Sequence, residues 1–191
     1  NTETMEEPLR ALAPDAVILA AGSTPLVPPI PGLEGSGYLA AQDLLLGRAA
    51  AGRRVLVAGG GMVGCEAAEF LAERGHQVDI VEMKDEIAAD VPRENRRLLF
   101  EAFGENGVGL YPGAKITCVY PDGVDYTSQG GGGSLRGYDS LILAMGTRRQ
   151  DSLARALEGQ VPQLLVVGDA AQCPGNAVLA TGTALDAALS I

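Results

Sequence analysis

Apolar residues in this chain gather in short runs, most of which end at a glycine or an acid. These runs lie at residues 15–22, 55–58, 78–81, 139–147 and 164–170. Their length and their β-branched content are typical of strands buried within a parallel sheet. Other segments, at 65–73, 93–103 and 177–191, carry apolar positions at helical spacing. The pattern therefore predicts an α/β fold built on a parallel sheet.

The run at 55–58 leads directly into a turn with the spacing Gly59-x-Gly61-x-x-Gly64, and a helical pattern starts at once. In such a turn Gly59 permits the tight bend, and Gly61 lets the backbone approach a pyrophosphate. Gly64 lets the helix pack close to the strand. The start of the helix also offers N–H groups and the positive end of its dipole to phosphates.

An acid follows this helix at the position that a dinucleotide-binding unit requires. The strand at 78–81 ends on Glu82, which lies 18 residues beyond Gly64. An acid about 20 residues on accepts a hydrogen bond from the ribose 2′-hydroxyl. We therefore interpret the segment as a dinucleotide-binding βαβ unit and not as a plain glycine-rich turn. Because a carboxylate repels a 2′-phosphate, Glu82 favours NAD(H) over NADP(H), and Lys84 is the residue that could soften this preference.

The composition of the 191 residues fits a folded soluble protein, with 47% hydrophobic and 20% charged residues. The length allows one large domain or two small ones. A net charge of −10 argues against binding to nucleic acid or to an anionic membrane. We find no signal peptide and no apolar run of membrane-spanning length, so we expect a cytoplasmic protein.

The cysteines and the single histidine limit what the side chains can do. Cys65, Cys118 and Cys173 form no C-x-x-C pair and lack metal-ligand spacing, so we expect reduced thiols and no metal site. His76 lies in a predicted loop and is the only histidine, which excludes a histidine-based triad. If a cofactor carries the chemistry, no side chain is needed as acid or base, and we assign no catalytic residue.

Two features predict more than one domain. Four prolines within residues 25–32 exclude helix and central strand, so we expect an extended linker between domains. Residues 15–23 and 139–147 share six positions at a constant offset of 124 residues. Two equivalent strands that enclose a complete βαβ unit indicate one dinucleotide-binding domain inserted within another, although apolar strands ending in glycine can also recur by chance.

The remaining segments are expected to be short or irregular. We expect a helical lead-in at 1–13, a short helix or ordered loop at 38–50, a loop at 84–90, and short strands at 108–111, 115–120 and 124–128. The four glycines at 130–133 are expected to form a flexible hairpin tip, because they lie at no strand-to-helix junction. Asp169, at the end of the run at 164–170, either caps a turn or faces a ligand, and both interpretations stay open.

Together these residues resemble the two-dinucleotide-binding-domain flavoproteins, the pyridine nucleotide:flavin oxidoreductase superfamily. The segment from Gly59 to Glu66 matches the G-G-G-x-x-G-x-E motif of the NAD(H) domain, and Gly168-Asp169 matches the second FAD signature. The strand ends at 20–22 and 144–146 match the paired A-T-G motifs, although both lack the threonine. The resemblance implies two nested domains. A Rossmann-like NAD(P)-binding domain at 33–147 would be inserted into a partial FAD-binding domain of three-layer ββα type at 1–32 and 148–191.

Within that superfamily the amino-acid sequence most closely resembles one branch. Residues 41–45, 63–66 and 81–88 resemble the carboxyl-terminal half of the Old Yellow Enzyme-like multidomain reductases, such as 2-enoate reductase and 2,4-dienoyl-CoA reductase. In that branch NADH reduces FAD, and electrons pass through a 4Fe-4S cluster to FMN in an amino-terminal barrel. The resemblance therefore implies NADH and flavin as partners, together with the rest of a larger parent protein. A homo-oligomer is compatible with it.

The resemblance also assigns binding roles to individual residues. Those implied for NAD(H) are Gly59, Gly60, Gly61, Met62, Val63, Gly64, Glu66, Glu82, Met83 and Gly146, and those implied for FAD in the parent are Ala21, Gly22, Gly168 and Asp169. Among them, Met62 and Val63 would help hold the pyrophosphate, Glu82 the adenosine ribose, and Glu66 would lie near the nicotinamide amide. For Glu66 the alternative is a solvated glutamate on a polar helix face.

The chain departs from the family pattern before Asp15, where the first FAD βαβ unit should stand. We therefore expect a fragment that keeps NAD(H) binding, with FAD binding weak or absent and FMN and 4Fe-4S confined to missing regions. The expected function is delivery of hydride from NADH to flavin within a larger oxidoreductase. The alternative is a non-catalytic module that senses NAD(H), and a disulfide reductase is disfavoured because no redox cysteine pair is present.

Overall fold

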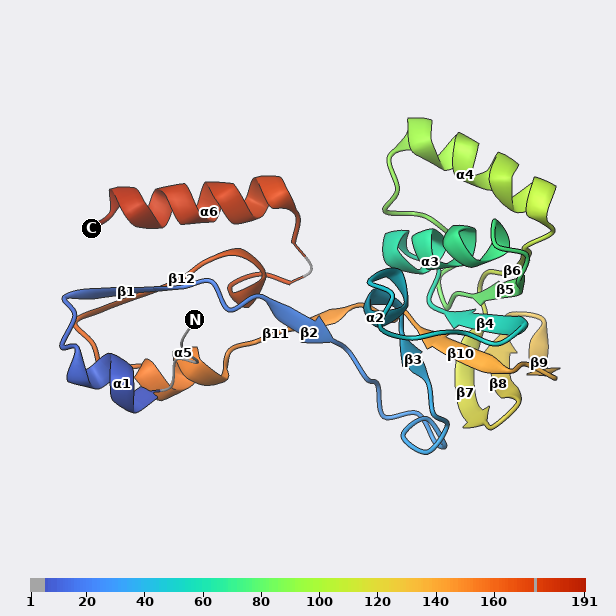
Figure 1. Cartoon of the computed structure of the whole chain (residues 1–191), viewed down its shortest axis with the longest axis horizontal. Helices are drawn as coiled ribbons and strands as arrows, with labels where there is room; N and C mark the ends of the chain where they lie inside the picture. The colour runs from blue at the N-terminus through green and yellow to red at the C-terminus, as the bar shows by residue number, and fades with distance from the viewer. Residues whose placement is uncertain (1–5, 174) are drawn as a thin grey trace. The chain divides into compact units, whose positions relative to one another are not determined.

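The computed structural model describes residues 6–173 and 175–191, which form two compact units (Figure 1). Unit 1 combines the described residues up to Leu26 with those from Thr147 onward, and unit 2 is the continuous segment Val27–Gly146. Helix α1 (Glu6–Ala11) corresponds to the helix expected at 1–13, and residues 1–5 of that prediction lie outside the described residues. Within the described residues, no helix combines the length and apolar character needed to span a membrane.

Unit 2 is built on a five-stranded sheet in the order β3-β10-β4-β5-β6, and every neighbouring pair is parallel. The strands are β3 (Leu39–Ala40), β10 (Ser140–Leu143), β4 (Arg54–Ala58), β5 (Gln77–Val81) and β6 (Gly109–Tyr111). Helix α3 (Met62–Ala72) connects β4 to β5, and α4 (Arg93–Asn106) connects β5 to β6. The short α2 (Ala41–Leu45) follows β3. The predicted α/β fold with a Rossmann-like parallel sheet is confirmed.

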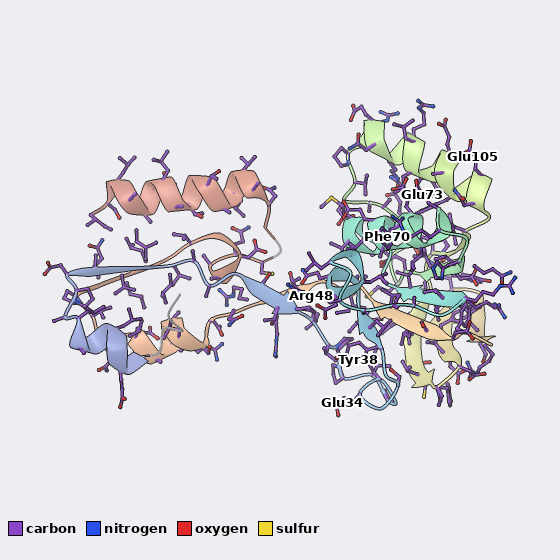
Figure 2. The ribbon with its side chains drawn as sticks, in the orientation of Figure 1. Glu34, Tyr38, Arg48, Phe70, Glu73 and Glu105 are labelled. Carbon is purple, nitrogen blue, oxygen red and sulfur yellow. The ribbon has the colours of Figure 1, made fainter. Side chains whose placement is uncertain are left out.

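Strand β4 lies at the centre of unit 2, and both of its faces are buried, as expected for a strand in a parallel sheet. Val55 and Val57 belong to one apolar cluster, which includes side chains of α2, α3 and α4. Leu56 and Ala58 belong to a second cluster, which includes side chains of the antiparallel hairpins described next. Phe70 on α3 packs against the first cluster (Figure 2). Burial on both faces fixes the position of the turn that follows Ala58.

A three-stranded antiparallel sheet follows β6, formed by β7 (Lys115–Tyr120), β8 (Gly123–Ser128) and β9 (Gly131–Arg136). The prediction that the glycines at 130–133 form a hairpin tip is wrong for three of them, since Gly131 and the next two glycines pair with β8. The reason is steric. A Cβ at Gly133 would lie 2.6 Å from Cζ of the Tyr126 ring, so glycine makes room for that ring within the strand.

Unit 1 contains two pairs of strands. Strand β1 (Ala16–Leu19) runs parallel to β12 (Gln163–Val166), and β2 (Ser23–Pro25) runs antiparallel to β11 (Thr147–Arg149). The helices of this unit are α1, α5 (Ser152–Leu157), the 3₁₀ turn η1 (Gly168–Ala170) and α6 (Ala177–Leu189). The predicted strand at 164–170 is too long, because the chain leaves the sheet after Val166 and turns at Gly168, where φ is +62°.

The repeat seen in the sequence corresponds to equivalent structure. The offset of 124 residues relates β1 to β10 and also β2 to β11. A glycine in the left-handed region lies between β1 and β2, Gly22 at φ +72°, and another lies between β10 and β11, Gly146 at φ +92°. The same local sequence therefore makes a strand, a glycine turn and a second short strand in both places.

Candidate functional site

The glycine turn lies at the carboxyl ends of β4, β5 and β10, the edge where open parallel sheets bind ligands. Gly59 has φ +109°, and its N–H donates to the carbonyl of Val81 at 2.8 Å. A Cβ at Gly59 would overlap the carbonyl group of Ala144, and a Cβ at Gly64 would overlap the carbonyl oxygen of Gly59. The fold itself therefore requires glycine at both positions.

Gly61 differs from its neighbours, because nothing in the backbone requires glycine there. It is the N-cap of α3 with φ −76° and ψ −176°, a conformation open to any residue. The three heavy atoms nearest to a Cβ at Gly61 would all belong to the carboxylate of Asp90, with Oδ2 at 3.2 Å. Glycine thus leaves a space beside the backbone that a Cβ would fill. This space and the N-terminus of α3 fit a dinucleotide pyrophosphate.

Glu82 follows β5 and lies beneath this turn, with 8% of its surface exposed. Its Oε2 accepts a hydrogen bond from the N–H of Gly60 at 2.7 Å, and its Oε1 accepts one from the N–H of Lys84 at 2.8 Å. A Cβ at Gly60 would lie 2.9 Å from Cβ of Glu82, which explains this glycine too. Each carboxylate oxygen keeps a further lone pair for a ribose hydroxyl. The ribose role of Glu82 stays a prediction.

Asp90 is a residue of the site that the sequence analysis missed. Its Oδ1 accepts a hydrogen bond from the N–H of Met62 at 2.9 Å, in the first turn of α3. The N-cap Gly61 has no side chain to do this, so the cap comes from a loop 28 residues away along the chain. No local capping pattern reveals such a contact, because capping signatures join residues within one turn.

Cys65 lies inside the first turn of α3 and is fully buried. Burial raises the pKa of its thiol to about 12, and the negative charge of Asp90 adds to the effect. The thiol donates a hydrogen bond to the carbonyl of Gly60 at 3.4 Å. Within the described part of the chain all three cysteines are free. Cys65 therefore stays protonated near neutral pH and acts as a packing residue.

The other residues expected to bind NAD(H) line or border the same edge of the sheet. Met62, Val63 and Met83 are partly exposed, with Met83 the most open at 66%. Glu66 lies on the exposed side of α3 beyond them. Gly146 follows β10, and a Cβ there would meet nothing within 4 Å. Unit 2 thus brings together the residues implied for NAD(H), and their binding roles stay predictions.

The residues expected to face FAD belong to unit 1. Asp169 lies in the turn η1, and its Oδ2 accepts a hydrogen bond from the hydroxyl of Ser23 at 3.0 Å. Gly168 donates its N–H to the hydroxyl of Thr183 at 2.9 Å. Gly22, next to the exposed Ala21, accepts a hydrogen bond from the N–H of Gln150 at 3.0 Å. Both interpretations of Asp169 remain open, since a turn carboxylate of this kind can still meet a ligand.

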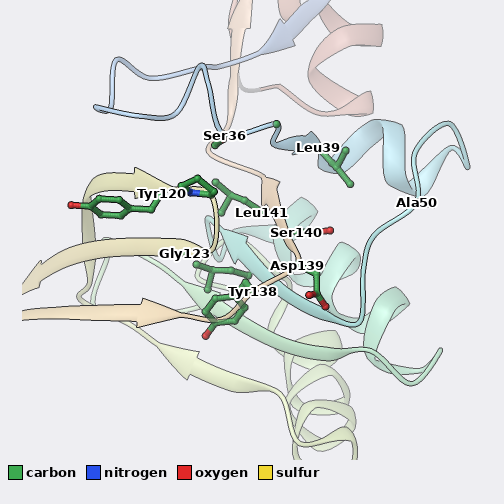
Figure 3. Close-up of a pocket in the computed structure, with 12 residues that line it drawn as sticks. Ser36, Leu39, Ala50, Tyr120, Gly123, Tyr138, Asp139, Ser140 and Leu141 are labelled. Atoms are coloured by element: carbon green, nitrogen blue, oxygen red, sulfur yellow. The ribbon is translucent and has the colours of Figure 1, made fainter.

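A separate cavity of about 130 Å³ lies in unit 2, where β3 and β10 begin (Figure 3). Its polar side chains already have partners within the protein. Asp139 accepts from the N–H of Arg54, Ser140 accepts from the N–H of Gly52, and Tyr138 donates to Asp79. Burial, followed by the bond to Asp79, raises the pKa of the Tyr138 hydroxyl. These hydrogen bonds stabilise the amino-terminal edge of the sheet, and the cavity is distinct from the glycine turn.

Comparison with known proteins finds relatives that are oxidoreductases by name. The chain is 39% identical over 163 residues to bilirubin reductase of Mediterraneibacter gnavus, a match that covers 85% of this chain and 25% of the relative. It is 36% identical over 169 residues to NADH oxidase of Thermoanaerobacter brockii, covering 86% and 26%. The chain thus spans about a quarter of the length of these relatives.

The fold is shared with solved enzymes of the same kind. A complex of 2-naphthoyl-CoA reductase with 2-naphthoyl-CoA superposes with a TM-score of 0.82 and 27% sequence identity, covering 92% of this chain and 27% of that one. A water-forming NADH oxidase from Lactobacillus brevis bound to NADH superposes with a TM-score of 0.62 and 22% identity, which shows likeness of fold alone.

The match to a family extends over nearly the whole chain. Residues 1–184 match the sequence model of the family described as pyridine nucleotide-disulphide oxidoreductase. This match confirms the resemblance to FAD- and NAD(P)-dependent oxidoreductases that the glycine motif and the paired strand ends predict. This chain belongs to the pyridine nucleotide-disulphide oxidoreductase family.

Proposed function

We propose that this chain is the NAD(H)-binding part of a larger NADH-dependent flavin oxidoreductase, in which it presents the hydride of NADH to a flavin. The observation that carries the proposal is the contrast among the glycines of the turn. Close packing of the fold accounts for Gly59, Gly60 and Gly64, whereas the space beside Gly61 at the start of α3 is bordered by the exposed side chain of Asp90. A pyrophosphate is the group for which that space and the helix N-terminus are suited.

The residues of unit 2 would divide the work of holding the dinucleotide. Backbone N–H groups at Met62 and Val63 would bind the pyrophosphate, Glu82 the adenosine ribose, and Glu66 and Gly146 would lie along the nicotinamide side. NADH, when bound, supplies the hydride, so these residues bind and orient and need no acid or base of their own. The flavin of the parent protein would contact unit 1 at Ala21, Gly22, Gly168 and Asp169.

The proposal includes a preference for NADH over NADPH. The carboxylate of Glu82 is buried and held by two backbone N–H groups, so it has little freedom to turn away from a 2′-phosphate. Coulomb repulsion between these like charges is stronger near a buried carboxylate than in open water. The side chain of Lys84 is exposed at the same edge and is the nearby positive charge that could weaken the preference.

Calorimetric titration of the chain with NADH and with NADPH tests this proposal. We expect NADH to bind more tightly, and we expect Gly61→Val to lose NADH binding while remaining folded, because φ −76° suits valine. The matched control is Gly35→Val, since a Cβ at Gly35 meets nothing within 4 Å and lies far from the turn in sequence. Normal NADH binding by a folded Gly61→Val variant would contradict the assignment of the pyrophosphate site.

A further inference from the structure

The carboxylate of Asp90 lies where the proposed function requires an anion of the ligand. Its Oδ1 is bonded to the N–H of Met62 at 2.9 Å, and its oxygens are 3.2 and 3.5 Å from the position of a Cβ at Gly61. These are the same helix N-terminus and the same space that would receive the pyrophosphate. The Asp90 carboxylate therefore accepts a hydrogen bond from the first turn of α3, and its negative charge interacts favourably with the positive end of the helix dipole.

The segment between β5 and α4, which includes Asp90, is held against the glycine turn by buried residues and hydrogen bonds. Ile87 and Ala88 are buried, and the N–H of Ala88 donates to the carbonyl of Gly60 at 2.7 Å. Ala88 has φ +58°, a conformation unfavourable for a residue with a Cβ. Arg96 of α4 donates to the carbonyl of Ile87 at 2.9 Å. The segment is thus anchored directly on the glycine turn, and its strained residue lies two positions before Asp90.

The negative charge of Asp90 is not neutralised by a neighbouring side chain. Arg96 forms its ion pair with Glu86, and Asp90 belongs to none of the ion pairs found among residues 6–173 and 175–191. The carboxylate is exposed, so it can rotate away from α3 without breaking the apolar anchor at Ile87 and Ala88. Neither burial nor an ion pair within those residues therefore holds the carboxylate on Met62.

We propose that Asp90 is an internal competitor for the pyrophosphate site, so that NADH binds only when this carboxylate leaves the N-terminus of α3. The inference rests on the proposed function, because it concerns the same site. A phosphate that takes the N–H of Met62 would lie at contact distance from the Asp90 carboxylate, and like charges at that distance repel. Asp90 thereby lowers the affinity for NADH and makes it depend on the position of the segment from β5 to α4.

Titration of the full chain with NADH, followed by calorimetry, tests the inference with two variants. Asp90→Asn keeps the shape and one oxygen acceptor but removes the charge, and we expect it to bind NADH about fivefold or more tightly than the wild type. Asp85→Asn is the control, because it removes the same charge from an exposed residue of the same segment. We expect the control to change the affinity by less than about twofold, because the Asp85 carboxylate lies beside Gly113 and not at the N-terminus of α3.

Each outcome separates the inference from the function on which it rests. If the wild type binds NADH and Asp90→Asn binds equally or more weakly, the inference is wrong and the proposed function stands. If neither the wild type, Asp90→Asn nor Asp90→Ala binds NADH while thermal unfolding shows all three folded, both are wrong. Binding by the variants alone supports both. A structure with NADH bound that still has Asp90 on the N–H of Met62 would also overturn the inference.

Discussion

The two units of this chain bury their apolar side chains to different extents. Unit 2 surrounds β4 with apolar residues on both faces, and Val55, Leu56, Val57 and Ala58 have no exposed surface. In unit 1 the cluster of buried residues consists of Val17, Leu19 and Leu157. Stability per residue grows with the apolar area that a unit can remove from water. Unit 2 thus has an apolar core on both faces of its sheet, whereas the buried cluster of unit 1 is much smaller.

Helix α6 shows the difference most directly. Val178, Leu185, Leu189 and the following Ile191 are between 61% and 81% exposed, although their helix is apolar overall. Helix α3 in unit 2 instead buries Cys65, Ala68 and Leu71 against the sheet. Helix α6 and the residue that ends the chain thus leave large apolar side chains exposed, whereas α3 buries its own.

The strongest test of this comparison removes one large side chain from each core. Phe103→Ala in unit 2 should lower the free energy of unfolding by about 3–5 kcal/mol, and Leu157→Ala in unit 1 by about 2–5 kcal/mol. Because the two clusters share no residue, we expect each variant to shift a different unfolding transition. Urea unfolding followed by circular dichroism measures both transitions.

The tyrosines of the chain provide a probe that distinguishes the two unfolding transitions. The protein has no tryptophan, and its five tyrosines, Tyr38, Tyr111, Tyr120, Tyr126 and Tyr138, all belong to unit 2. Tyrosine fluorescence should therefore report the transition that Phe103→Ala shifts and ignore the one that Leu157→Ala shifts. A single transition that both variants shift equally would refute the independence of the two cores.

We expect alkaline pH to lower the stability of unit 2 alone, by less than the core substitutions above and by more than the surface substitution below. The folded pKa of Cys65 is raised to about 12 from an ordinary value of 9.0, mainly by burial. The folded state thus favours the protonated thiol, and its contribution to stability is complete below pH 9 and is lost as the pH rises toward 12. We expect the unfolding transition of unit 2 to weaken over this range and that of Cys65→Ala to weaken less, both followed by circular dichroism because tyrosines themselves ionise at about pH 10. Equal loss in both proteins would show that another group is responsible.

The smallest effect is expected on the surface of unit 1. Leu185→Ser replaces a side chain that is 61% exposed, so we expect the unfolding free energy to change by less than about 0.5 kcal/mol. Val57→Ser, on the fully buried β4, is the matched change in unit 2 and should be much more costly. A large destabilisation by Leu185→Ser would mean that α6 is covered in the chain as it stands. Thermal unfolding of both variants decides this.

Local sequence patterns were sufficient for the central part of the fold. The strand at 55–58, the glycine turn and the helix after it follow from apolar runs and from spacing, because each depends on residues near one another in the chain. The repeat at an offset of 124 residues likewise revealed the equivalence of β1 and β10. Glu82 could be identified as a candidate ribose-binding residue from its distance to the glycines along the chain.

Longer-range contacts explain where the patterns failed. Gly131 and its two successors belong to a strand because β8 pairs with them, and no property of four glycines in a row predicts a strand. Helix α5 also lies in a segment without a recognised helical pattern. The run at 164–170 ends early because Gly168 turns the chain, which apolar content alone cannot indicate.

The sequence by itself determined the class of fold, the order of the central strand, turn, helix and strand, and the presence of a dinucleotide-binding motif, because backbone conformation and burial periodicity are encoded over a few residues. Only the tertiary structure decided which of the glycines the packing requires and that Gly61 borders the side chain of Asp90. It also decided that Asp90 lies on the N–H of Met62. Those contacts join segments far apart in the chain, and their geometry depends on how the sheet and helices pack.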